Sequence, residues 1–153
     1  MAEEPKLLPV QVKGFVLDKV SQSPIVLLQP EDTEEVMLIW IGPSEAHSIA
    51  LLLSGAKYER PLTHDLLKLA LDGLEAKHRR TEITHLENNT FFARVLLQKG
   101  SDFISIDCRP SDGIAMALRS EADIYVDREL FESQKQVIQT SRDGEAGESG
   151  EED

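Results

Sequence analysis

The sequence predicts a single compact α+β domain with a mixed, mostly antiparallel sheet and about three helices. Short apolar runs of strand character outnumber the helical segments, and Asn88-Asn89 joins two of these runs in the manner of a tight hairpin. The chain has 153 residues, of which 41% are hydrophobic and 5% aromatic, so it can bury a core that is mainly aliphatic. Residues 7–133 are expected to form this domain.

The expected strands are bounded by Gly, Pro, Asn and Ser residues that favour turns. Residues 36–41 (VMLIWI) are six apolar residues in a row. Such a run is typical of a strand buried on both faces, and it predicts that Trp40 lies in the core. The expected strands cover residues 10–20, 25–28, 36–41, 77–86, 90–98, 103–108 and 123–126.

Three segments carry the signals of a helix. In two of them a proline at the first helical position precedes an acidic residue in the first turn. Thr63 fits the N-cap of the remaining helix, and Gly55 is the expected stop of the first. The expected helices run from Pro43 to about Ser54, within residues 60–76, and from Pro110 to about Ser120.

The formal charge of −12 is unevenly distributed. Residues 140–153 hold six acidic residues, one arginine and no large apolar residue, which predicts a disordered acidic tail. An acidic chain is poorly suited to gripping nucleic acid by bulk electrostatics. The N-terminus lacks the apolar region of a secretory signal, no apolar stretch is long enough for a membrane helix, and Cys108 is the one cysteine. The expected setting is therefore the cytoplasm, without a membrane partner.

One strand-to-helix corner occurs twice in the sequence. Residues 43–51 (PSEAHSIAL) align without gaps on residues 110–118 (PSDGIAMAL), and each segment follows an apolar strand. The pattern could be good helix-start chemistry used twice. It could also bring acidic side chains together at a site, because functional residues often lie where a strand ends and a helix begins.

If these corners converge, their carboxylates could bind a divalent cation. Oxygen ligands of this kind suit magnesium or manganese. The candidate metal ligands are Glu45, Asp65, Asp107 and Asp112.

The same segments resemble the bifunctional nuclease family. The resemblance is carried by LIWIGPSEAHSIALLL, RPLTHDLL and ISIDCRPSDGIAMALR in that order, and it extends from about Val10 to Phe131. It implies a compact α+β domain that associates as an oligomer and cuts both DNA and RNA. Cys108 and Gly113 stand where the family pattern usually has alanine. The matching positions are Gly42, Glu45, Ala46, Arg60, Pro61, Thr63, His64, Asp65, Asp107, Arg109, Pro110, Ser111 and Asp112.

Phosphodiester hydrolysis suggests a role for each candidate residue. The predicted catalytic residues are His64, Asp65 and Asp112, with His64 as general acid or base because an imidazole titrates near neutral pH. Arg60 and Arg109 would bind phosphate, because a planar guanidinium can donate two parallel hydrogen bonds to its oxygens. Two simpler readings stay open: Asp107 and Arg109 could form only a local ion pair, and His64 could only cap or pack its helix. Cys108 is expected to be a small buried thiol rather than a nucleophile.

A non-catalytic oligomeric binding or regulatory module is the alternative function. The first helix is apolar nearly all round, so it needs cover on more than one side. A self-pairing dimer is the commonest arrangement of that kind.

Overall fold

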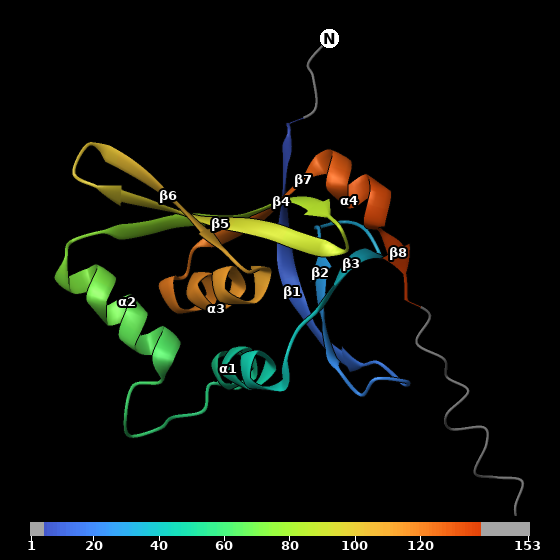
Figure 1. The fold of residues 1–153 in the computed structure, drawn as a ribbon, viewed down its shortest axis with the longest axis horizontal. Helices are drawn as coiled ribbons and strands as arrows, with labels where there is room; N and C mark the ends of the chain where they lie inside the picture. Colours follow the sequence, from blue (N-terminus) through green and yellow to red (C-terminus); the bar gives the residue numbers. More distant parts are fainter. Residues whose placement is uncertain (1–4, 139–153) are drawn as a thin grey trace, which may run out of the picture.

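A computed structural model of the chain describes residues 5–138 (Figure 1). The predicted acidic tail, residues 140–153, lies outside the described residues. The strands are β1 (Leu7–Leu17), β2 (Pro24–Gln29), β3 (Glu35–Trp40), β4 (Lys77–Glu87), β5 (Thr90–Lys99), β6 (Asp102–Cys108), β7 (Asp123–Asp127) and β8 (Gln136–Val137). The helices are α1 (Pro43–Ser54), α2 (Thr63–Gly73), α3 (Pro110–Ser120) and α4 (Arg128–Gln134).

The eight strands form one sheet in the order β6-β5-β4-β7-β1-β2-β3-β8. Neighbouring strands run antiparallel except β4 and β7, which are parallel. The prediction of an α+β domain with a mixed, mostly antiparallel sheet is confirmed. The prediction of about three helices missed α4, a seven-residue helix too short to show a periodic apolar pattern. Asp127 caps α4, accepting a hydrogen bond of 3.1 Å from the Leu130 N–H.

The core is aliphatic, as predicted, and buried side chains of β2 and β3 form part of it, together with Ile49, Ile114 and Phe131 from three helices. Trp40 is the exception, because 52% of its surface is exposed. It is the last residue of β3, and its indole N–H donates to the Asp18 carboxylate across 3.0 Å. The prediction of a core tryptophan was wrong: Trp40 lies between the buried Ile39 and Ile41, so its side chain points to the opposite side of the chain, where it is exposed.

A predicted turn shapes the sheet, and a glycine contact places α3 against it. The hairpin between β4 and β5 turns at Asn88 and Asn89, both with positive φ, as asparagine tolerates. Gly113 lets α3 approach β4 closely, because a Cβ at this position would lie 2.6 Å from Thr81 Cγ2. The Thr81 hydroxyl also donates to the Gly113 carbonyl across 2.8 Å. This contact fixes the first turn of α3 against the sheet.

Helices α1, α2 and α3 form one group beside the sheet, and α4 lies apart from them, near β7 and β8 (Figure 1). Both α1 and α2 contact α3. The repeated strand-to-helix corners therefore do meet, and the first turn of α2 joins them. Among the described residues, no helix is long and apolar enough to cross a membrane.

Candidate active site

The first turns of α1, α2 and α3 enclose a pocket of about 300 Å³. Four of the predicted site residues line it: Glu45 from α1, His64 from α2, and Arg109 and Asp112 from the start of α3. These side chains come from three separate segments of the chain, so the fold, and not local sequence, brings them together.

Arg109 joins two of the carboxylates. Its Nε and Nη2 donate to the two oxygens of Asp112 across 2.9 and 3.1 Å, and its Nη1 donates to Glu45 across 3.0 Å. A forked guanidinium on a carboxylate is a strong and directional pair. The Arg109 side chain is nevertheless 63% exposed, so one edge of the guanidinium faces solvent. Arg109 pairs with Asp112 and Glu45 and not with Asp107. The local ion pair between Asp107 and Arg109 that the sequence left open is therefore not formed.

His64 lies between Asp112 and Ser48. Its Nε2 is 2.9 Å from Asp112 Oδ1, and its Nδ1 is 3.0 Å from Ser48 Oγ. Because an ionised carboxylate can only accept, Nε2 must carry the hydrogen of that bond. In the neutral imidazole, Nδ1 is then the basic nitrogen and accepts from the Ser48 hydroxyl. The Ser48 hydroxyl, the His64 imidazole and the Asp112 carboxylate are therefore linked in series by hydrogen bonds. Such an arrangement of hydroxyl, base and orienting carboxylate can transfer protons.

A buried arginine, Arg119, holds two residues next to His64 in place. Arg119 is 3% exposed and donates to Asp65 across 2.8 Å and to Ser48 Oγ across 3.1 Å. Asp65 also accepts from the Tyr58 hydroxyl at 2.6 Å and from the Leu62 N–H at 2.9 Å, which caps the start of α2. Asp65 therefore faces this support and not the pocket.

Two carboxylates of the network, Asp112 and Asp65, have a lowered pKa. Burial acts to raise the pKa of Asp112, but hydrogen bonds from Arg109 and His64 outweigh it, and the pKa lies below its ordinary value. Burial likewise acts to raise the pKa of Asp65, and bonds from Tyr58, Leu62 and Arg119 lower it overall. Both side chains can thus accept hydrogen bonds across the neutral range.

Cys108 lies next to this network but is not activated. Burial and the nearby carboxylates of Asp112 and Asp107 raise the pKa of the thiol to about 11. A thiol in this state is a poor nucleophile at neutral pH.

The remaining predicted residues lie elsewhere. Asp107 is an exposed residue of β6, in register with Arg94 of β5, and Arg60 is exposed in the segment before α2. Neither of them lines the pocket. Among residues 5–138, no three His, Cys, Asp or Glu side chains lie close enough to hold a metal ion between them. The four carboxylates proposed as metal ligands therefore do not form one cluster.

Three residues of the network were missed from sequence: Ser48, Tyr58 and Arg119. Ser48 lies one helical turn after Glu45, on the pocket side of α1. That spacing was a usable signal, because side chains three apart share a helix face. Arg119 lies two turns after Asp112, and no local pattern shows that an arginine there is buried.

The fold and the pocket define a small α+β domain whose helix starts gather groups for anion binding and proton transfer. A sequence profile of the bifunctional nuclease domain matches residues 26–139. The chain belongs to the bifunctional nuclease domain family.

The chain is also similar to individual proteins of a bacterium and of plants. An uncharacterised protein of Mycobacterium tuberculosis is 34% identical over 137 residues, which cover 90% of this chain and 82% of the relative. Bifunctional nuclease 1 of Arabidopsis thaliana is 26% identical over 136 residues, covering 85% of this chain and 42% of the relative. Bifunctional nuclease 1 of Oryza sativa subsp. indica is 29% identical over 110 residues, covering 69% of this chain and 33% of the relative. The chain thus spans less than half of these plant relatives.

Proposed function

We propose that the chain is a nuclease that hydrolyses phosphodiester bonds of DNA and RNA at the pocket between α1, α2 and α3. One observation carries the proposal: the site places a cation, Arg109, beside a histidine whose ring is oriented by Asp112. The family and the names of the plant relatives support the same activity.

Arg109 binds the scissile phosphate in this proposal. Three of its five N–H groups donate to Asp112 and Glu45 within residues 5–138, which leaves two for phosphate oxygens. The partner carboxylates hold the guanidinium in place, so it is already oriented when negative charge builds up on those oxygens. Because the network fixes Arg109 before substrate arrives, little ordering is needed at the moment of reaction.

His64 transfers the proton. Its Nδ1 accepts a proton from the attacking water, either directly or through the Ser48 hydroxyl that bridges Nδ1 to the pocket. The carboxylate of Asp112 stabilises the imidazolium that results, and the ring then returns the proton to the leaving oxygen. Asp65, predicted as catalytic, acts instead as a positioning residue through Arg119 and Ser48.

A divalent metal is a separate part of the proposal. The side chains as placed do not fit a preformed metal cage, since of the four proposed carboxylate ligands only Glu45 and Asp112 line the pocket, and both are paired with Arg109. Magnesium often binds through one or two carboxylates and takes its other ligands from substrate phosphates and water. Magnesium or manganese would therefore depend on the substrate to complete its coordination here.

The experiment is cleavage of plasmid DNA and of RNA by the purified chain, with magnesium, with manganese and with a chelator. We expect cleavage of both nucleic acids. Loss of cleavage in chelator would establish the metal requirement, and retained cleavage would leave the Arg109 and His64 chemistry on its own. A chain that is inert under all of these conditions would contradict the proposed function.

A specific observation favours a second candidate, a non-catalytic oligomeric binding module. No residue of α2 is buried, and every residue of β6 before Cys108 is exposed. Exposed apolar side chains on these elements are typical of a surface that another subunit covers. We propose a homodimer through the exposed apolar side chains of α2, of β6 or of both, and gel filtration with light scattering would test it. The exposed apolar residues are Leu66, Leu67, Leu69, Leu74, Phe103, Ile104 and Ile106. The cytoplasmic location stays a prediction.

A further inference from the structure

Ser48 has the contacts of an activated nucleophile as well as those of a proton relay. It lies on α1 one turn after Glu45, and although it is only 8% exposed, it lines the pocket of His64. Its hydroxyl contacts two side chains, His64 Nδ1 at 3.0 Å and Arg119 Nη2 at 3.1 Å. What this oxygen can do chemically depends on where its one hydrogen lies.

The two ends of this hydrogen-bonded chain fix the direction of every hydrogen in it. A guanidinium can only donate, so Ser48 Oγ accepts from Arg119. An ionised carboxylate can only accept, so Nε2 of His64 donates to Asp112, and Nδ1 carries no hydrogen in the neutral ring. The hydroxyl hydrogen of Ser48 therefore points to Nδ1. Within residues 5–138, the second lone pair of Oγ has no donor, so it is available for attack on a substrate.

The order of Ser48, His64 and Asp112 is the order of groups that activates a serine in hydrolases of unrelated folds. In those sites the histidine takes the hydroxyl proton, and the carboxylate orients the ring and stabilises the imidazolium. Here Nδ1 faces the serine and Nε2 the carboxylate, the reverse of serine proteases, but either ring nitrogen can act as the base. Arg119 adds a positive charge beside Oγ, which stabilises the negative charge that develops there as the proton leaves.

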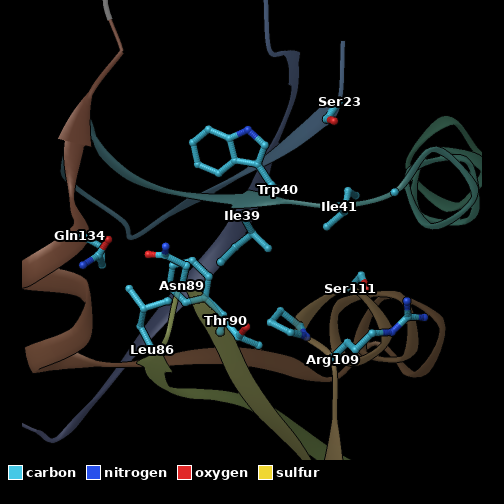
Figure 2. Close-up of a pocket in the computed structure, with 13 residues that line it drawn as sticks. Ser23, Ile39, Trp40, Ile41, Leu86, Asn89, Thr90, Arg109, Ser111 and Gln134 are labelled. Carbon is cyan, nitrogen blue, oxygen red and sulfur yellow. The ribbon is translucent and has the colours of Figure 1, made fainter. Parts of the chain in front are cut away.

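Arg109 puts the proposed phosphate contact in the same pocket as Ser48. Both residues line the pocket of about 300 Å³ between the helix starts. A larger cavity of about 640 Å³, between the end of β3 and the β4–β5 hairpin, also borders Arg109. Figure 2 shows the Arg109 side chain pointing away from this larger cavity, and its bonds to Asp112 and Glu45 hold the guanidinium beside the smaller pocket. A phosphate on Arg109 therefore shares the pocket of the Ser48 hydroxyl.

We infer that Ser48 is the nucleophile and that cleavage passes through a covalent phosphodiester between Oγ and one fragment of the substrate. The substrate is that of the proposed function, on which this inference rests. In the first step Oγ bonds to phosphorus while the bond from phosphorus to the leaving oxygen breaks, and the hydroxyl proton passes through Nδ1 of His64 to that oxygen. In the second step a water oxygen bonds to phosphorus while the bond to Oγ breaks, and a water proton passes through Nδ1 to Oγ. Water thus attacks only the covalent intermediate.

An alkyl fluorophosphonate tests the nucleophile without relying on cleavage of nucleic acid. Ser48 Oγ would displace fluoride from phosphorus and keep the phosphonate as a stable ester, while the proton goes to His64. We expect mass spectrometry of the digested chain to find the adduct on Ser48, and we expect labelling to be about 10²-fold slower in His64→Ala. The absence of an adduct on Ser48, or an adduct on Ser44 of the same pocket in its place, would overturn the inference.

The configuration at phosphorus shows whether one displacement or two take place. The substrate is an oligonucleotide in which one linkage is chiral at phosphorus through a sulfur atom, and it is cleaved in water labelled with heavy oxygen. Each in-line displacement inverts the configuration, so two displacements give net retention and a single attack by water gives inversion. We expect retention. Inversion would overturn the covalent intermediate and leave the nuclease intact, whereas an adduct on Ser48 without cleavage would overturn the nuclease and leave the nucleophile.

Two serines of α1 provide a matched pair of variants. Ser48→Ala should lower kcat by about 10³-fold or more and abolish the adduct, with an unchanged circular dichroism spectrum. Ser54 is exposed at the end of the same helix, donates to the Leu51 carbonyl across 3.1 Å and lies outside the pocket. Ser54→Ala should therefore cleave and label within about twofold of the parent. A folded Ser48→Ala variant that cleaves as fast as the parent would overturn the inference.

Discussion

Replacing His64 by alanine is expected to lower the rate of phosphodiester cleavage by about 10²- to 10⁴-fold, the range in which general acid–base groups contribute. The reason is its position: His64 bonds to Asp112 at 2.9 Å and to Ser48 at 3.0 Å, and it lines the pocket beside Arg109. The alanine variant keeps phosphate binding through Arg109, so kcat should fall much more than KM rises.

His85→Ala is the matched control for this prediction. His85 is an exposed histidine on β4 that stacks on Phe92 and does not line the pocket of His64. Its variant should cleave within about twofold of the parent rate. The measurement is kcat and KM on one fluorescent oligonucleotide for all three proteins. Equal losses in the two variants would mean that His64 has no special part in the reaction.

Replacing Arg119 by methionine is expected to lower the free energy of unfolding by about 3 kcal/mol. The Arg119 side chain is 3% exposed and donates hydrogen bonds to both Asp65 and Ser48. Methionine fills a similar volume but donates nothing, so Asp65 loses its charged partner and Ser48 loses a donor. Because Ser48 also bonds to His64, cleavage by the folded variant should fall as well.

Arg79→Met is the comparison that isolates burial. Arg79 is an exposed arginine on β4 whose side chain bonds to Gln98 across the strand pair. The same substitution there should change the free energy of unfolding by less than about 0.5 kcal/mol. Urea unfolding followed by circular dichroism gives both values, and similar losses at the two positions would contradict the structural role assigned to Arg119.

Sequence reasoning succeeded where the physical signal is local. The Pro-Ser-acid starts of α1 and α3 and the Asn88-Asn89 turn depend on nearby backbone groups, so they can be predicted without the fold. The corners of α1 and α3 also proved to be neighbours in space, which brought Glu45 and Asp112 to one arginine.

The failures depend on tertiary contacts. Asp107 and Asp112 lie on either side of the same corner, and only the fold shows that the first points away on β6 while the second faces His64. Whether Arg119 is buried depends on how α1 and α2 cover α3. Trp40 lies between two buried isoleucines, Ile39 and Ile41, but its side chain is on the other face of the strand, which the fold leaves exposed. None of these outcomes is encoded within a few residues.

The most direct test of the proposed site is the cleavage rate of Asp112→Asn measured beside that of Asp107→Asn. Both changes remove one negative charge and keep nearly the same shape, so they differ only in where the carboxylate lies. We expect a loss of about 100-fold for Asp112→Asn, because His64 and Arg109 lose their shared partner, and a change of less than about twofold for Asp107→Asn. Equal losses in both variants would contradict the proposed site.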